Sequence, residues 1–240
     1  METVNINLSE RFEIAFNRIH KALSKMVNQG ASDIFGHLVT QGAKKHAIIR
    51  TYKDELYQFA KLRNAIVHEK LRADFYIAEP HEDVVRQIEE IADHFEMPIT
   101  ALSISNSPVF YFNYHSSIKD VVLAMNKKTY TKFPIFKNGT CVGLLTAGAI
   151  IKWMAEHLAE NIIDLSDIRV SEVVPYETKH LIDFLHKDSD IFDVEALFEK
   201  RHAHGKKLEA VIITENGKTD EKPLGIITSW DTIKIDYMVN

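Results

Sequence analysis

The amino-acid sequence predicts an α+β protein in which an all-α helical bundle precedes an α/β module built from two repeats. Apolar side chains recur at helical spacing as far as Met97, and Pro98 follows directly. Beyond Pro98 the pattern changes to short β-branched and aromatic runs, which are typical of strands. The segments Gly143–Thr146 and Gly225–Thr228 each end such a run and open a helix-like run, so they indicate an internal repeat. Paired repeats of this kind commonly form a cleft between their halves, where small molecules bind.

The composition is that of a globular protein large enough for two modest domains. The chain has 240 residues, of which 45% are hydrophobic and 26% are charged, and its net charge is −5. This acidic balance excludes a general attraction to nucleic acid, so a contact with RNA would need a local basic patch. Cys141 is the single cysteine, which excludes an intramolecular disulfide and fits a reducing cytosol. Without a signal peptide or an apolar run long enough to span a bilayer, we expect a cytoplasmic protein with no membrane insertion.

Three helical stretches are expected in the N-terminal domain. The first covers about residues 8–26 and the second about residues 43–63, each with an apolar face. The third covers residues 80–97, because proline is favoured in a first helical turn and acidic residues follow it there. Residues 64–68 contain no helix breaker, so either the second helix continues through them or a new one begins.

Each C-terminal repeat is expected to have the order β-α-β-β-α. The first strand is predicted at Val109–Phe112 in one copy and at His180–Leu185 in the other. Ser117 and the pair Ser189–Asp190 follow these strands as N-caps of the next helices.

The domain boundaries follow from the same pattern. The helical domain covers residues 1–97 and the tandem module covers residues 98–240. Within the module, the first repeat is expected at about 99–165 and the second at 166–240.

The C-terminal half resembles a CBS (cystathionine-β-synthase) domain pair, also called a Bateman module. The resemblance is carried by Phe133–Phe136 with Gly143–Thr146 in one copy, and by Ala210–Ile213 with Gly225–Asp231 in the other. Because the pattern occurs in two copies in the same order, the resemblance is more specific than a single copy would make it. The resemblance implies that the module senses an adenine nucleotide (AMP, ADP or ATP), held as a regulatory ligand between the two halves.

Thr228 and Asp231 are the candidate ligand-binding residues. A carboxylate can accept hydrogen bonds from the two vicinal hydroxyls of a ribose, while a helix N-terminus and a threonine hydroxyl suit a phosphate. The resemblance assigns this contact to the Thr-x-x-Asp spacing. The first copy keeps Thr146 but has Ala149 in place of the acid, so we expect one competent site. The alternative is that Thr228 and Asp231 only cap a helix, since this combination is common at helix starts.

A second resemblance lies in the N-terminal domain. The run Leu62–Glu69 contains Arg63, Asn64 and His68, and this pattern in a helical domain resembles the HEPN superfamily. Many members of that superfamily are metal-independent ribonucleases that work as dimers. A histidine can transfer the proton of a ribose 2′-hydroxyl, and an arginine can hold the phosphate and stabilise its developing charge. The resemblance therefore makes Arg63, Asn64 and His68 candidate catalytic residues, with no metal required.

Two further considerations bear on this motif. On a straight helix the step from Arg63 to His68 turns the second side chain by about 140° from the first, which favours a site completed across a dimer interface or a bend near Asn64. The structural alternative is that Arg63 pairs with an acid such as Glu69 and that His68 is a capping or interface residue. Several basic residues lie near the motif, and they are equally consistent with an RNA-binding surface and with a solvated helix face. They are Lys44, Lys45, Arg50, Lys53, Lys61, Arg63 and Lys70.

The leading hypothesis is a homodimeric, nucleotide-sensing regulatory protein in which the CBS pair controls a HEPN-like domain that cuts or binds RNA. The alternative is a non-catalytic adenine-nucleotide-binding module whose helical domain mediates dimerisation or docks a partner. Whether the protein is an enzyme is left open at this point.

Overall fold

The structure is a computed structural model that describes residues 7–27, 33–68, 79–128, 130–157, 164–177 and 181–235. The chain divides into two compact units, Met1–Ile99 and Thr100–Asn240. The described part of the first unit is helical, whereas the second combines helices with two sheets. The predicted mixture of helix and sheet is therefore confirmed. Within the described ranges no helix combines the length and the apolar character needed to cross a bilayer.

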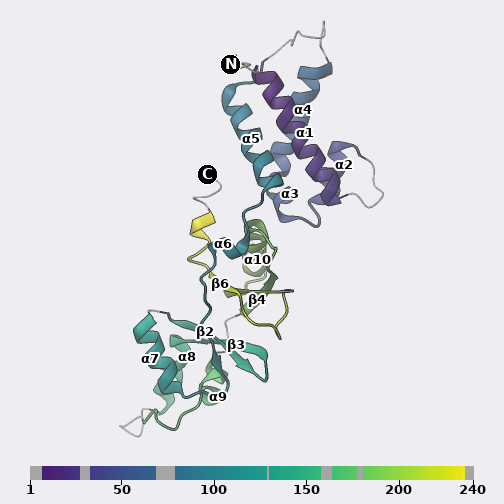
Figure 1. The fold of residues 1–240 in the computed structure, drawn as a ribbon. Coiled ribbons are helices and arrows are strands. Elements are labelled where there is room, and N and C mark those ends of the chain that lie inside the picture. The colour runs from purple at the N-terminus through teal and green to yellow at the C-terminus, as the bar shows by residue number, and fades with distance from the viewer. Residues whose placement is uncertain are drawn as a thin grey trace, which may run out of the picture. The chain divides into compact units, whose positions relative to one another are not determined.

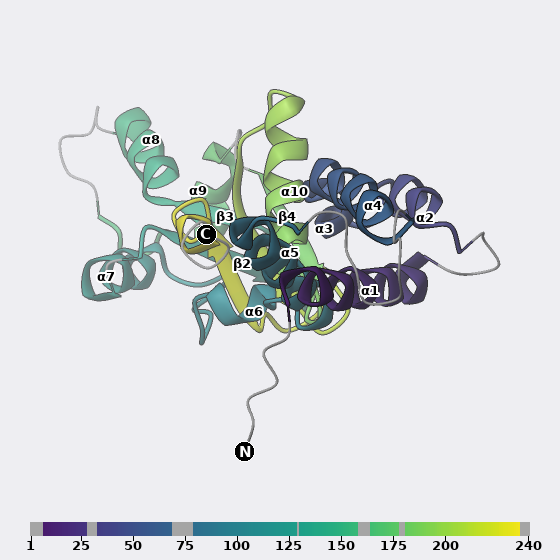
Figure 2. The ribbon, with the colours of Figure 1, turned by 90° about the horizontal axis from the view of Figure 1, so that it is seen from above.

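Helices α1, α2, α4 and α5 form a bundle in the first unit, with α1 packed along α5 and also against α2 and α4 (Figures 1 and 2). The helices described there are α1 (Leu8–Val27), α2 (Phe35–Gly42), α3 (Ala47–Thr51), α4 (Lys53–His68) and α5 (Glu82–Glu96). Their buried apolar faces form the core of the unit.

The contact between α1 and α5 combines an apolar seam with ion pairs at its edge. Phe12 and Ile19 of α1 and Ile88 of α5 are fully buried. At the rim, Arg11 forms a bidentate pair with Glu89, with distances of 2.9 and 2.7 Å. Because both partners of this pair are partly exposed, the seam contributes most of the stability and the ion pair contributes little.

Two details of the helical unit differ from the sequence prediction. Helix α2 was not expected, and the single helix predicted over residues 43–63 is divided into α3 and α4. The break between α3 and α4 falls at Tyr52, whose φ of −92° and ψ of 15° lie outside the α-helical region. Before α3, Gly42 packs closely on two side chains: a Cβ there would lie 2.5 Å from Ile49 Cδ1 and 2.9 Å from Val27 Cγ2. Helix α4 then continues without interruption through Asn64 to His68, which resolves the alternative that the sequence left open.

The second unit contains two three-stranded sheets of identical topology. In the first sheet, β1 (Phe112–Asn113) is parallel to β2 (Lys132–Lys137), which is antiparallel to β3 (Thr140–Thr146). In the second sheet, β4 (Leu181–His186) is parallel to β5 (Leu208–Thr214), which is antiparallel to β6 (Gly225–Thr228). The repeated connectivity is what the two similar sequence segments predicted.

Helices connect the strands at matching points of the two repeats. α7 (Ile118–Lys128) links β1 to β2, and α10 (Ile191–Ala203) links β4 to β5. α8 (Ala147–His157) follows β3, and a helical turn begins at Ile233 after β6. The remaining helices are α6 (Ala101–Ile104), α9 (Val170–Val173) and the 3₁₀ helix η2 (Val174–Tyr176).

The caps and turns of the module follow from the sequence. Asp190 caps α10: its Oδ1 accepts from the backbone N–H of Asp193 at 2.9 Å, and Asp193 returns the contact in a capping box. The turn between β2 and β3 places Asn138 and Gly139 at positive φ, as an Asn-Gly hairpin turn requires. One prediction was too long: the strand expected at Val109–Phe112 is reduced to Phe112–Asn113.

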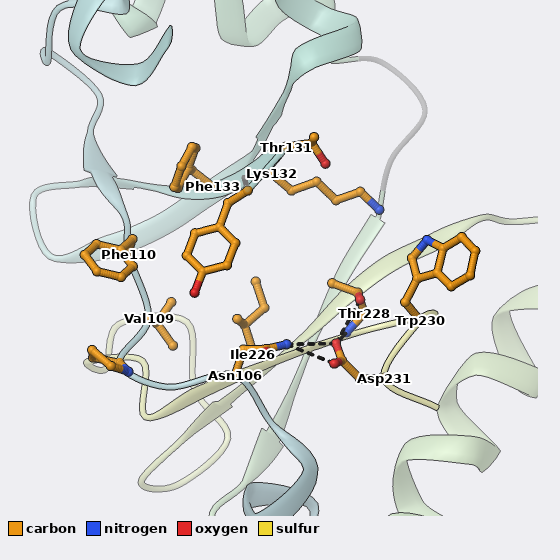
Figure 3. A pocket seen from close by; sticks show the side chains of 12 residues that line it. Asn106, Val109, Phe110, Thr131, Lys132, Phe133, Ile226, Thr228, Trp230 and Asp231 are labelled. Atoms are coloured by element: carbon orange, nitrogen blue, oxygen red, sulfur yellow. Dashed lines mark hydrogen bonds between the residues drawn. The ribbon is translucent and has the colours of Figure 1, made fainter. Parts of the chain in front are cut away.

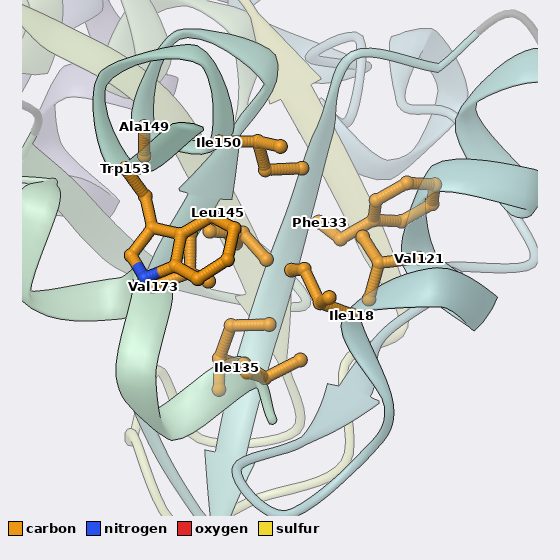
Figure 4. Packing of buried hydrophobic residues seen from close by; sticks show 10 residues of the cluster. Ile118, Val121, Phe133, Ile135, Leu145, Ala149, Ile150, Trp153 and Val173 are labelled. Carbon is orange, nitrogen blue, oxygen red and sulfur yellow. The ribbon is translucent and has the colours of Figure 1, made fainter. Parts of the chain in front are cut away.

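One face of the first sheet is covered by helices (Figure 4). Its buried core combines residues of α7, α8 and α9 with those of β2 and β3: Ile118, Val121, Phe133, Ile135, Leu145, Ala149, Ile150, Trp153, Val170 and Val173. The opposite face of this sheet meets the second repeat through Phe136, Cys141 and Ile212. Burial in this inter-sheet cluster raises the pKa of the Cys141 thiol, so the cysteine acts as a small packing residue.

Residues 100–106, called here the lead-in segment, precede the first repeat in sequence but pack on the second. The backbone N–H of Ala101 donates to Ser189 O at 2.8 Å, immediately before α10. Asn106 pairs in both directions with Ile226 of β6, with N···O distances of 2.9 and 3.2 Å. The first residues of the module therefore complete its last repeat.

Candidate ligand-binding site

A pocket of about 310 Å³ lies where the first residues of β2 approach the end of β6 (Figure 3). Phe110 and Trp230 stand at opposite ends of it, and Asp231 and Thr131 lie on opposite sides. Its lining is Asn106, Pro108, Val109, Phe110, Tyr130, Thr131, Lys132, Phe133, Ile226, Thr228, Trp230 and Asp231. The pocket is therefore built by both repeats together with the lead-in segment.

The polar side of the pocket is centred on the carboxylate of Asp231, which is 7% exposed. Its Oδ2 accepts from the Thr228 backbone N–H at 2.9 Å and from the Thr228 hydroxyl at 2.8 Å. The side-chain amide of Asn106 donates to both carboxylate oxygens at 3.0 Å, and Lys234 Nζ donates to Oδ1 at 2.9 Å. The structure thus brings together the two predicted residues Thr228 and Asp231 and adds two donors.

These contacts keep Asp231 ionised. Burial alone would raise the pKa of the carboxyl, because it removes water from the charged form. The hydrogen bonds from Thr228, Lys234 and Asn106 outweigh that effect, so the pKa of Asp231 lies below its ordinary value. At neutral pH the pocket therefore presents a carboxylate acceptor, the chemistry that a vicinal diol requires.

Lys132 is the second charged residue of the lining, and it comes from the opposite repeat. Its ammonium is paired with Glu209, which is 3% exposed and which also binds Lys207 at 2.6 Å. In the strand register Lys132 pairs with Thr146 and Ala210 pairs with Thr228, so Lys132 and Ala210 are equivalent positions of the two repeats. Glu209, the neighbour of Ala210, thus stands where the first repeat has the pocket residue Thr131.

Aromatic side chains supply the remaining walls. Phe110 and Tyr130 are neighbours, with ring centroids 5.9 Å apart, and Lys128 Nζ lies 4.4 Å from the centre of the Phe110 ring. Trp230 is 78% exposed and directly precedes the buried Asp231. Large exposed rings beside an acceptor carboxylate provide surfaces on which a planar base can stack.

The third predicted ligand-binding residue, Thr146, occupies a different environment. It is buried, and its hydroxyl accepts from the Ala149 backbone N–H at 3.2 Å, as an N-cap does. The same hydroxyl donates to the carboxylate of Glu177, which follows η2. Neither Thr146 nor Glu177 belongs to the pocket lined by Asp231.

Three residues of these networks were not anticipated from the sequence: Asn106, Lys234 and Glu177. Asn106 is 125 residues away from Asp231 along the chain, and no spacing rule connects them. Glu177 supplies the carboxylate that is missing at Ala149, and it comes from an irregular segment. The only available clue was the sequence departure at Ala149, which marked the first copy as different.

The three candidate catalytic residues lie on α4. Arg63 is half-buried, with its guanidinium carbon 6.0 Å from the centre of the Phe16 ring of α1, while Asn64 is exposed. His68 is the last residue of α4, and its side chain falls outside the described part of the structure. Lys44, Lys45, Arg50, Lys53 and Lys61 are exposed, and Lys70 lies outside the described residues.

Comparison with known proteins identifies one domain in the chain. The CBS domain family model matches residues 101–156, so this part of the protein contains a CBS domain. No curated protein matches the chain.

Solved structures of CBS-domain proteins also match. A CBS domain pair in complex with 5′-methylthioadenosine and S-adenosyl-L-methionine is 17% identical, with a TM-score of 0.43 and coverage of 60% of this chain and 99% of that chain. A CBS domain protein of unknown function from Thermoplasma acidophilum is 20% identical, with a TM-score of 0.40 and coverage of 57% and 69%. CBSX2 in complex with AMP is 13% identical, with a TM-score of 0.41 and coverage of 59% and 98%.

Proposed function

We propose that residues 100–240 bind an adenine nucleotide as a regulatory ligand and thereby control the helical unit. The observation that carries this proposal is the ionised Asp231 in a pocket that also has Thr228, aromatic walls and Lys132. The ribose would bind at Asp231, the base would stack on the aromatic side chains, and the phosphate would lie toward Lys132 or Thr228. The CBS domain match over residues 101–156 supports the same proposal.

The two repeats differ in a way that favours one nucleotide per chain. In the first repeat Ala149 provides no carboxylate for a ribose, and the Thr146 hydroxyl is already bonded to Glu177. Glu209 adds a buried negative charge at the matching strand position. Lys132 and Lys207 balance the Glu209 charge, whereas the Glu177 carboxylate beside Thr146 would repel a phosphate there.

Calorimetric titration of the purified protein with AMP, ADP and ATP tests the nucleotide site. We expect one molecule bound per chain, and we expect Asp231→Asn to weaken binding by at least about 10-fold, because a neutral amide is a poorer acceptor for two hydroxyls. Glu177→Gln serves as the matched control and should leave the affinity unchanged. Equal affinities of Asp231→Asn and the wild type would rule out this site.

The proposal extends to the helical unit, where Arg63, Asn64 and His68 would act on RNA within a homodimer. Exposure of Asn64 on α4 and of several nearby lysines supports contact with an anionic partner. The nucleotide can change this activity only to the extent that it binds more tightly to one conformation of the protein. Catalysis of this kind would use the arginine and histidine side chains and would not require a metal.

The second candidate function is a module without catalysis, in which the helical unit dimerises or docks a partner. The position of the Arg63 guanidinium over the buried Phe16 favours it, because a half-buried arginine packed on a core ring is typical of a structural residue. In this case the protein binds nucleotide but never cleaves RNA.

Incubation with labelled RNA, with and without each nucleotide, separates the two functions. The ribonuclease proposal predicts that His68→Ala and Arg63→Ala abolish cleavage, while Gln58→Ala, an exposed change on the same helix, does not. Cleavage by His68→Ala at the wild-type rate would remove the catalytic proposal. Tight nucleotide binding without cleavage under any condition would establish the docking module.

A further inference from the structure

Asn106 is the residue of the pocket whose contacts the proposed function does not explain. Its Nδ2 lies 3.0 Å from each oxygen of Asp231, so this one amide nitrogen is shared between both oxygens of the carboxylate (Figure 3). A ribose would use its two vicinal hydroxyls to donate to the same pair of oxygens. The amide of Asn106 and a ribose would therefore occupy the same two oxygens of Asp231.

The acceptor capacity of Asp231 is fully used by the protein itself. A carboxylate has about four acceptor positions. Thr228 makes two contacts with its backbone N–H and its hydroxyl, Lys234 makes one and the Asn106 amide makes two, so five contacts share these positions. Two ribose hydroxyls can reach the carboxylate only after other donors have left it.

The donors differ in how readily they can leave. The Thr228 N–H is fixed by the backbone at the end of β6, so it keeps the carboxylate in position. The backbone of Asn106 is also fixed, by its two hydrogen bonds to Ile226, but its side-chain amide can turn about its own torsions. Rotation of this amide therefore removes one contact from each Asp231 oxygen without moving the lead-in segment.

We propose that Asn106 is a specificity-determining residue whose amide competes with the ribose of the ligand for Asp231. This inference rests on the proposed function and concerns the same site. The competition lowers the apparent affinity by the fraction of molecules in which the amide has turned away. It also selects for ligands that offer two hydroxyls, because a sugar with fewer donors cannot replace both amide contacts.

The test compares the wild type with Asn106→Ala in calorimetric titrations with AMP and with its 2′,3′-dideoxy analogue. Without the competing amide, AMP should bind about 10-fold more tightly, which corresponds to about 1.4 kcal/mol. The dideoxy analogue has no hydroxyls for Asp231, so its affinity should not change. Asn106→Ser, whose short side chain should not span both oxygens, is the second variant and should act in the same direction.

Asn216→Ala provides the matched control. Asn216 donates to Glu221 at 2.7 Å, so this variant also removes an amide-to-carboxylate hydrogen bond, but outside the pocket. It should leave the affinity for AMP unchanged. Thermal unfolding of each variant without nucleotide establishes that it is folded under the conditions of the titration.

The outcomes separate this inference from the proposed function. Tighter binding of AMP alone by both Asn106 variants supports the inference. If the wild type binds AMP but the Asn106 variants bind it equally or more weakly, Asn106 is only a positioning residue for Asp231 and the inference is wrong. An equal gain for the dideoxy analogue also overturns it. If neither the wild type nor the variants bind an adenine nucleotide, the proposed function and the inference are both wrong.

Discussion

The two repeats of the second unit have one topology but different chemistry where their closing helices begin. In the second repeat Thr228 is bonded to Asp231, and in the first repeat Thr146 is bonded to Glu177 from outside the repeated segment. The Asp231 carboxylate faces a pocket, whereas the Thr146 hydroxyl is buried against an acid. A shared backbone therefore does not give a shared binding site. Which segment supplies the carboxylate decides what each half can bind.

The largest expected effect tests whether the first repeat is held together by its own core. Trp153 is buried among α8, α9 and the first sheet, so Trp153→Ala should lower the free energy of unfolding by about 3–5 kcal/mol. Urea denaturation followed by circular dichroism measures this loss. Lys152→Ala, an exposed change next to it, should cause little change. A separate early transition in Trp153→Ala would show that the repeats unfold independently, and a loss below about 1 kcal/mol would contradict the packing described here.

The next effect concerns the ion pair that joins the repeats. Glu209→Gln removes the negative charge between Lys132 and Lys207 and should cost about 2 kcal/mol of stability, because charge-assisted hydrogen bonds to a buried group are lost. The matched control is Glu215→Gln, which breaks the exposed pair with Lys187 at 2.5 Å. That pair is screened by solvent, so its loss should not be measurable in the same unfolding experiment. Equal losses in the two variants would mean that Glu209 has no special role.

A smaller effect on stability depends on pH and concerns the carboxylate of Asp231. The folded-state pKa of Asp231 is lowered, so its ionised form stabilises the fold above the ordinary carboxyl pKa of about 3.9, and this stability is lost as the pH falls through the folded-state pKa. Asp231→Asn should therefore be less stable than the wild type by about 1–2 kcal/mol near pH 7, with the difference shrinking below about pH 4. Denaturation curves between pH 7 and pH 3 measure it. A difference that stays constant over this range would contradict the assigned role.

The smallest effect compares the N-caps of the matching helices α7 and α10. Asp190→Ala should cost about 1 kcal/mol, since it removes a charged cap and its capping box. Ser117→Ala should cost about 0.5 kcal/mol, because the Ser117 hydroxyl accepts one backbone N–H from Lys119 at 3.2 Å. Thermal unfolding of the two variants gives the order directly. The reverse order would show that the capping box adds nothing in this context.

Local patterns in the sequence were sufficient for the repeated topology. The two Gly-led strand ends, the Asn-Gly turn at Asn138 and the cap at Asp190 each act over a few residues, and each appears as predicted. Helix α5 was equally clear, because its apolar stripe is continuous and its first turn is acidic. Such features depend on the chain near them and can be read from it.

Features that depend on distant contacts could not be read in this way. The close approach of Ile49 and Val27 to Gly42 brings together three separate points of the chain. The contact of Asn106 with Asp231 likewise needs the fold before it exists. The spacing of Thr228 and Asp231 suggested the site, and Thr228 is one of its donors, but the amide of Asn106 comes from a distant part of the chain.

The lead-in segment has a consequence for how the molecule can be divided. A Cβ on Gly225 would lie 2.2 Å from Ser105 Oγ, so the last repeat is shaped around residues that stand before the first. Cutting the chain between the repeats would leave the second repeat without the lead-in segment that packs on it. The lead-in segment would stay attached to the first repeat, without the strand with which it pairs. Neither repeat is a self-contained unit. A transfer of these repeats to another protein would have to include both copies together with the lead-in segment.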